Sequence, residues 1–204
     1  MIVLNKNIKY HFNPFGGLSM KEIPSVINPE KHLIELRNLL QNSDPLILEL
    51  TGKKGRGKTT HLKLLHKYFP NSKMFQLEKG RNFFKEIMEA KSNLLFIDSI
   101  HHLNIFQRLK VYQMPKQIVF STHLTRSFEN IFSHNKFISF KIKGISSNYL
   151  MEMIKNRVKI AATGSIDTNQ IILNKELIEK LMSKYGDDYR GILRELYVNF
   201  SNEN

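Results

Sequence analysis

The stretch TGKKGRGKTT, residues 51–60, decides the fold of this chain. Gly52 and Gly57 are separated by four residues and are followed by Lys58 and Thr59, which is the G-x-x-x-x-G-K-[ST] pattern of a phosphate-binding loop. Glycines let backbone N–H groups turn inward around phosphate oxygens, and the positive end of the following helix faces the same anion. In such a loop, the lysine reaches the outer phosphates and the threonine hydroxyl binds Mg²⁺. The sequence therefore predicts a nucleotide-binding loop.

The residues on either side of the loop favour this interpretation over a chance Gly/Lys-rich turn. LILEL (46–50) is an apolar run typical of a buried strand, and residues 58–69 carry leucines at helical spacing. A strand entering the loop and a helix leaving it form the context that the motif requires. Solvated charge is the simplest role for Lys53, Lys54 and Arg56. From this loop we expect the following residues around the nucleotide: Gly52, Lys53, Lys54, Gly55, Arg56, Gly57, Lys58, Thr59 and Thr60.

Beyond the loop, apolar strand patterns alternate with helical patterns. Interleaved strands and helices predict an α/β fold with a parallel sheet covered by helices on both faces. The expected strands are 46–50, 73–77, 94–98, 117–121 and 137–142, and the expected helices are 29–41, 58–69, 81–91 and 103–111. Asn28 and Pro29 have the residue types that begin the first helix, and 43–45 those that end it.

The C-terminal residues predict a small helical subdomain. Ser146 and Asn174 are candidate N-caps, and Gly186 is a candidate helix end. A third helix is expected over 188–200, and a loop over 162–173. We therefore divide the chain into an irregular segment at 1–27, a nucleotide-binding core at 28–143 and a helical lid at 144–204.

Asp98 is the candidate metal carboxylate. It ends the strand LLFID (94–98), about 40 residues after Lys58, where a phosphate-loop protein holds Mg²⁺ with an aspartate. A carboxylate that only caps a turn is the alternative. Hydrolysis also needs a group that orients water. The hydroxyl of Ser99 is a weak base, and His101 or His102 could substitute for it. The favoured alternative is that one of these histidines faces solvent and the other packs.

Charge and composition limit the possible partners. The net charge is +13, and residues 45–143 carry 18 basic and 6 acidic groups, whereas 144–204 carry 8 of each. This concentration of positive charge indicates a polyanionic partner, which could be nucleotide, DNA or an acidic protein surface. The absence of cysteine fits a reducing cytoplasm. Neither a signal peptide nor a membrane-spanning apolar run is expected.

Together these motifs resemble the AAA+ P-loop ATPase superfamily over roughly residues 28–200, with 51–59 as Walker A and 94–98 as Walker B. The layout is similar to short bacterial AAA ATPases of the transposition-regulator, helicase-loader and secretion kinds. The resemblance implies sheet order 5-1-4-3-2, a helical lid, and ATP with Mg²⁺ as cofactors, Mg²⁺ being held by Thr59 and Asp98. No N-K-x-D guanine motif is present. Ser99 stands where such ATPases carry a glutamate, which predicts slow turnover.

The resemblance also implies further site residues. Ser121 and Thr122 are similar to sensor 1, and Arg190, with Arg194 as the alternative, is similar to the phosphate-facing arginine of sensor 2. Arg126 is the candidate arginine that completes a neighbouring subunit's site, and a surface arginine on a helix at 125–133 is the equal alternative. Residues 13–15 either line the adenine pocket or pack as a turn on the core.

Three functions fit the sequence. The first is a slow Mg²⁺-dependent ATPase that acts as a nucleotide-controlled switch or assembly factor. The second is a DNA-binding ATPase adaptor, and the third is a nucleotide-binding scaffold without hydrolysis. Self-assembly or a partner protein is compatible with each. The expected location is the cytoplasm.

Overall fold

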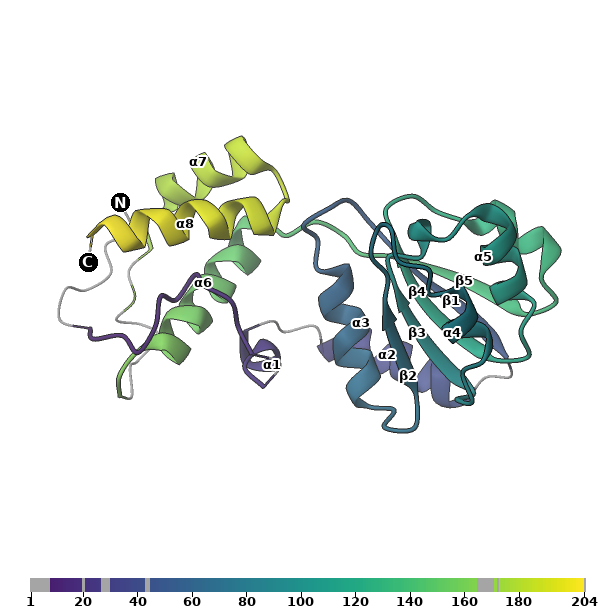
Figure 1. Ribbon diagram of the computed structural model, residues 1–204. Helices are drawn as coiled ribbons and strands as arrows, with labels where there is room; N and C mark the ends of the chain where they lie inside the picture. The colour runs from purple at the N-terminus through teal and green to yellow at the C-terminus, as the bar shows by residue number, and fades with distance from the viewer. Residues whose placement is uncertain are drawn as a thin grey trace. The chain divides into compact units, whose positions relative to one another are not determined.

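The computed structural model describes residues 8–19, 21–26, 30–42, 45–164, 171 and 173–203. The chain forms two compact units (Figure 1). The core unit comprises residues 29–143, and the helical unit joins the N-terminal segment to residues 144–204. The N-terminal segment, which the sequence sets apart, thus packs with the C-terminal helices.

The core unit is built on a five-stranded parallel sheet. The strands are β1 (Leu46–Thr51), β2 (Lys73–Gln76), β3 (Leu94–Asp98), β4 (Gln117–Thr122) and β5 (Lys136–Lys141). Their order is β2-β3-β4-β1-β5, which is the expected 5-1-4-3-2 order read from the other edge, so the predicted α/β fold is confirmed. Because all strands are parallel, their carboxyl ends share one edge, which carries the phosphate loop after β1, Ser99 after β3 and His123 after β4.

Helices cover both faces of this sheet, as the buried strand patterns require. On one face Phe96 of β3 contacts the rings of His66 and Phe69, which belong to helix α3 (Lys58–Lys67) and to the turn after it. On the other face Leu95 and Ile97 join the core cluster that α4 (Phe84–Met88) and α5 (Ile105–Tyr112) complete. Every residue of β1 and β3 is buried, which is the pattern expected of central parallel strands.

Several helices differ in extent from the sequence prediction. Helix α2 covers Glu30–Asn42, and α4 is much shorter than the expected 81–91. The helix expected at 103–111 is α5 (Ile105–Tyr112), which begins two residues later because Asn104 and Gln107 form its capping box. A 3₁₀ turn that the sequence did not predict, η1 (Ile100–His102), precedes it. The segment expected as a helix at 125–133 is a 3₁₀ helix, η2 (Ser127–Phe132).

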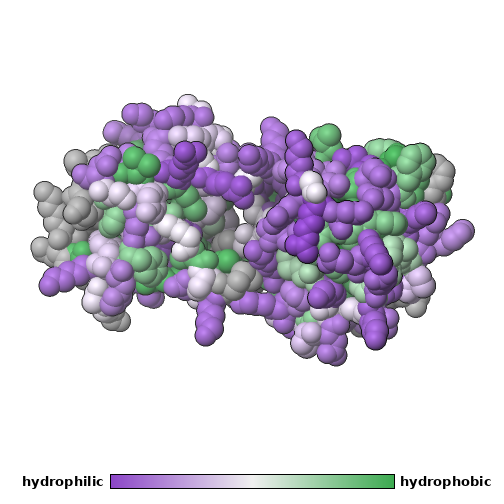
Figure 2. All heavy atoms as spheres, in the orientation of Figure 1, coloured by the Kyte–Doolittle hydropathy of each residue, from purple (hydrophilic) through white to green (hydrophobic). Residues whose placement is uncertain are grey.

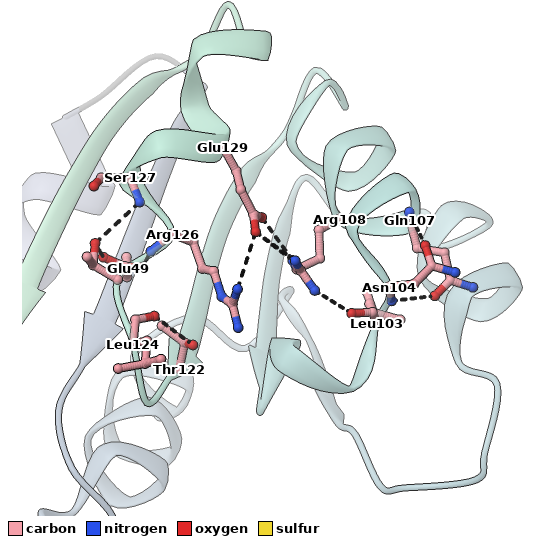
Figure 3. Close-up of polar contacts among 11 residues, drawn as sticks. Glu49, Leu103, Asn104, Gln107, Arg108, Thr122, Leu124, Arg126, Ser127 and Glu129 are labelled. Atoms are coloured by element: carbon pink, nitrogen blue, oxygen red, sulfur yellow. Dashed lines mark hydrogen bonds and ion pairs between the residues drawn. The ribbon is translucent and has the colours of Figure 1, made fainter.

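Two buried carboxylates fix the chain between β4 and β5. Glu49, wholly buried in β1, accepts hydrogen bonds from the hydroxyl of Thr125 (2.8 Å) and from the backbone N–H of Arg126 (2.5 Å). Glu129 of η2 accepts three hydrogen bonds from the Arg108 guanidinium of α5, at 2.6, 2.8 and 3.2 Å; Figure 3 shows this pair. This pairing raises the pKa of Arg108. Both partners are more than nine-tenths buried, so the pair attaches η2 to α5.

The helical unit contains α1 (Ile23–Val26), α6 (Ser147–Ala161), α7 (Lys175–Tyr185) and α8 (Tyr189–Glu203). The predicted caps are confirmed, since the side chains of Ser146 and Asn174 accept bonds from Tyr149 and Glu176 N–H groups, and Gly186 ends α7 at φ 58°. The apolar faces of α6, α7 and α8 form one cluster with Phe15.

Residues 13–15 pack as a turn within the helical unit, and their role in an adenine pocket stays a prediction. Phe15 is 3% exposed within the helical cluster. The Asn13 side chain donates to the backbone oxygen of Tyr197 (3.1 Å), and the buried guanidinium of Arg157 donates to the Pro14 carbonyl (2.8 Å). These bonds attach the N-terminal segment to α6 and α8.

Some predicted features lie outside the described residues. They are the cap at Asn28, the first helical position at Pro29, the helix end at 43–44 and most of the loop 162–173. Within the described ranges, no helix is long and apolar enough to cross a membrane.

The buried Arg108–Glu129 pair gives a test of the fold. Replacing Glu129 by alanine leaves a buried guanidinium without its carboxylate, so we expect a loss of about 3 kcal/mol in the free energy of unfolding. The double variant R108M/E129L removes both charges and should lose less than E129A alone. Urea titration followed by circular dichroism measures both. Glu86→Ala, which breaks an exposed ion pair with Arg81, is the control and should change little. Equal losses from E129A and E86A would contradict this role.

Candidate functional site

The phosphate loop lies between β1 and α3, as its sequence requires. Gly57 precedes α3 at φ 80°, a left-handed conformation that glycine adopts without steric cost. An added Cβ at Gly52 would stand 3.0 Å from the backbone oxygen of Ile142, so the loop passes closely beside the chain after β5. No side chain within the described chain caps α3. Its first N–H groups therefore point into the loop, where an anion is favoured.

Lys58 is buried under the loop. Its ammonium group donates to the carbonyl oxygens of Gly52 (2.6 Å) and Lys53 (2.8 Å), and it lies 3.2 Å from Nδ1 of His123. These contacts hold the charge at the centre of the loop. Lys53 and Lys54 are exposed, as their solvated interpretation expects, whereas Arg56 is partly buried.

The candidate metal ligands are in direct contact. The hydroxyl of Thr59 donates to Oδ2 of Asp98 (2.8 Å), and the hydroxyl of Ser121 donates to Oδ1 of the same carboxylate. Mg²⁺ prefers oxygen ligands and is commonly held by one carboxylate, a hydroxyl and substrate phosphates. The donor set of Thr59 and Asp98 fits such an ion, and bound Mg²⁺ would supply charge neutralisation for the phosphates.

Ser99 occupies a strained turn at the end of β3. Its backbone is left-handed (φ 63°, ψ 48°), and it is the one non-glycine residue with positive φ in the described chain. Its N–H group donates to the Ser121 hydroxyl at 2.8 Å. The same hydroxyl thus bonds both Ser99 and Asp98, which joins β3 to β4 beneath the loop. A non-glycine residue keeps a left-handed backbone only where surrounding contacts hold it there, and such residues cluster at functional sites.

Ser121 and Thr122, the two residues similar to sensor 1, make different contacts in the structure. Ser121 supports Asp98, whereas the hydroxyl of Thr122 donates to the carbonyl of Leu124 (3.0 Å) and so stabilises the turn after β4. The side chain that reaches Lys58 from this strand end is His123. Sequence analysis missed His123; its position directly after a buried strand end was the signal that could have found it.

His123 belongs to a group of three histidine rings. The rings of His101 and His123 have centroids 5.0 Å apart, and those of His101 and His102 4.3 Å apart. Burial, with smaller effects from the neighbouring His102 and His123, lowers the pKa of His101. Burial, followed by the charge of Lys58, lowers the pKa of His123. Both shifts favour neutral imidazoles beside the phosphate loop.

Arg126 is held within its own chain. Its backbone N–H group donates to the Glu49 carboxylate, and its guanidinium lies 3.5 Å from the Glu129 carboxylate (Figure 3). The Arg126 side chain is 22% exposed. Its charge also contributes to the low pKa of His101. A role in a neighbouring subunit's site remains a prediction.

Arg190 and Arg194 lie on α8 of the helical unit with exposed side chains. The backbone N–H of Arg190 donates to Asp188 (3.1 Å), which forms part of the helix start. Their role at the nucleotide remains a prediction from the resemblance.

No known protein family and no curated protein matches the sequence. Solved structures do match. Cdc6p from Pyrobaculum aerophilum has a TM-score of 0.58 at 15% identity, covering 94% of this chain and 66% of that one. DnaA from Aquifex aeolicus with AMPPCP bound gives 0.54 at 15% identity, with 82% and 58% covered. Drosophila ORC bound to DNA gives 0.54 at 16% identity, with 87% and 56% covered.

These structures are AAA+ P-loop ATPases, and the chain has their fold. At such identities the likeness concerns the fold alone. The chain spans 66% or less of the length of these three structures.

The doubly bonded Ser121 hydroxyl gives a test of the metal site. In Ser121→Ala, Asp98 loses one of its two hydroxyl donors, so we expect the gain in ATP affinity on adding Mg²⁺ to fall about tenfold. Binding of ATP in EDTA should change little. Isothermal titration calorimetry measures the ATP affinity of each protein with Mg²⁺ and in EDTA. The exposed Ser127→Ala is the control, and an S121A protein with undiminished Mg²⁺ dependence would contradict the assignment.

Proposed function

We propose that this chain binds ATP with Mg²⁺ and acts as a nucleotide-controlled switch with slow ATP hydrolysis. The observation that carries the proposal is the arrangement of Lys58, Thr59 and Asp98 at the carboxyl edge of the sheet. A buried ammonium lies inside the loop, and a hydroxyl and a carboxylate touch beside it. This is the combination that a nucleoside triphosphate with its metal requires.

Slow turnover follows from the residue after Asp98. The attacking water needs a group that orients it, and a serine hydroxyl is a weaker acceptor than a carboxylate. Ser99 also uses its backbone N–H to bind Ser121, so its position serves the strand junction. A protein that keeps ATP intact for long can signal through its bound state.

The helical unit is the element that we expect to respond to nucleotide. In the proposal, Arg190 is the residue of this unit whose contact with the phosphates differs between ATP and ADP. A ligand shifts a conformational equilibrium only by its difference in affinity for the two states.

Lys58→Ala tests nucleotide binding. Charge-assisted hydrogen bonds contribute about 1.5–3 kcal/mol each, so we expect ATP affinity to fall about 10- to 100-fold. Fluorescence of a mant-labelled ATP analogue measures the dissociation constant, and phosphate release measures turnover. Lys67→Ala, at the exposed far end of α3, is the matched control. Equal affinities of wild type and K58A would refute the proposed ATP site.

DNA binding is the second candidate function, and the distribution of charge on the core unit favours it. Of its 18 basic residues in 45–143, only Lys58 and Arg108 are buried. Of its six acids, Glu49, Asp98 and Glu129 are buried, and the others lie between residues 78 and 89. Hydrophilic side chains predominate on the face of the core unit drawn in Figure 2. Beyond that short acidic stretch, the accessible charges of 45–143 are therefore all positive, which suits a polyanion.

The DNA alternative predicts strong salt dependence. Displacement of counterions by lysines makes affinity for a fluorescent duplex fall at least about tenfold between about 50 and 200 mM salt. K136E/K141E, at exposed positions of β5, should weaken binding, whereas K180E on α7, in the segment 144–204 whose basic and acidic groups balance, should not. Anisotropy measures both. No binding at low salt would eliminate this function.

A further inference from the structure

The site lacks a strong acceptor for the attacking water at the position that follows Asp98. Ser99 has a short side chain, and its left-handed backbone is fixed by the bond to Ser121. If the chain hydrolyses ATP, the group that orients water must come from another element at the same edge of the sheet.

His123 has the right position for contact with the end of the triphosphate. It follows the end of β4, it is covered by the protein on one side and open to solvent on the other, and its Nδ1 lies 3.2 Å from the Lys58 ammonium. In a phosphate loop this ammonium is the group that reaches the outer phosphates. An atom that contacts Lys58 from the strand side therefore stands close to the terminal phosphate of a bound ATP.

His101 supports His123 from the next strand end. It belongs to η1, which follows β3 and Ser99, and its ring packs between those of His102 and His123. Its Nδ1 is buried and has no hydrogen-bond partner within the described part of the chain. A buried ring nitrogen of this kind retains the capacity for one more hydrogen bond.

The surroundings of the two rings suit an anion and its water, and they do not suit a metal. The positive groups that act on them are Lys54, Lys58 and Arg126, and the negative one is Asp98. Within the described ranges, no group of three or more His, Cys, Asp or Glu residues is arranged to hold a metal ion. Burial favours the neutral form of both imidazoles, and a neutral imidazole has one nitrogen that accepts a hydrogen bond.

We propose that His101 and His123 form a water-orienting pair that replaces the missing glutamate, with His123 against the terminal phosphate and His101 holding the attacking water. This inference rests on the proposed function. The water oxygen bonds to the terminal phosphorus while the bond from that phosphorus to the bridging oxygen breaks. The electron pair of that bond leaves on ADP, and the water proton passes to an oxygen of the released inorganic phosphate.

The test combines turnover with separate affinities for ATPγS and ADP. His101→Ala should lower kcat at least about tenfold with both affinities within about twofold of wild type, because water is oriented only for reaction. His123→Ala should lower kcat and also reduce the preference for ATPγS over ADP. His101→Gln and His123→Asn retain a hydrogen-bonding group and should keep more activity than the alanine variants. His134→Ala, an exposed histidine of the same unit, is the control.

A restored glutamate makes the test specific. In the S99E/H101A double variant, the new carboxylate should orient water without His101 and return kcat at least to the wild-type value. A merely structural role for His101 would leave the double variant as slow as H101A. Circular dichroism and retained ADP affinity identify any variant that fails to fold, in which case the glutamine and asparagine variants decide.

The outcomes separate this inference from the proposed ATP site. Wild-type kcat in H101A and H123A would overturn the pair while leaving ATP binding intact. A wild-type protein that binds ATPγS but releases no phosphate would also overturn it. Loss of the proposed site is recognised independently, by K58A binding ATP as tightly as wild type.

Discussion

The Asp98 carboxylate is the point on which the site depends. One of its oxygens accepts from Thr59 at the start of α3, and the other accepts from Ser121 at the end of β4. Three segments far apart in the sequence thereby meet at one carboxylate that is 3% exposed. A buried carboxylate requires hydrogen-bond donors, and here the donors are the hydroxyl groups of Thr59, at the end of the phosphate loop, and of Ser121 in β4. The interaction that stabilises the junction is also the one that would present Mg²⁺ to ATP.

The parallel sheet explains why a few residues from distant parts of the sequence are enough to form the candidate site. Parallel strands direct their carboxyl ends to one edge, so the residues after β1, β3 and β4 converge without further architecture. At this edge a residue can be fixed by its structural role, and Ser99 is an example. Its left-handed backbone and its bond to Ser121 serve the junction, and its short side chain leaves the water without a carboxylate. The histidines at the ends of β3 and β4 are the chemical groups that the same edge offers instead.

The fold, the phosphate loop and the position of Asp98 could be predicted because the sequence patterns that determine them are local. The spacing of Gly52, Gly57 and Lys58, and the apolar run before Asp98, depend on residues adjacent in sequence, and the sheet order followed from the resemblance that they carry. Other features depend on contacts between distant residues. His123 was missed because only the approach of β4 to the phosphate loop gives it a partner. The attachment of Arg126 by Glu49, 77 positions away, has no sequence period that would reveal it. Likewise, the N-terminal turn joins α6 and α8 through Arg157 and Asn13, across more than 140 positions.

Hydrogen–deuterium exchange with and without Mg²⁺-ATPγS tests the central claim most directly. If Lys58, Thr59 and Asp98 form the ATP site, exchange should slow in the peptides that cover residues 51–60, 98–103 and 121–126. Peptides that cover residues 89–93 and 113–117, which lead into β3 and β4 at the opposite edge of the sheet, should exchange at the same rate in both states. Slower exchange confined to other segments, or identical exchange in both states at saturating nucleotide, would contradict the account.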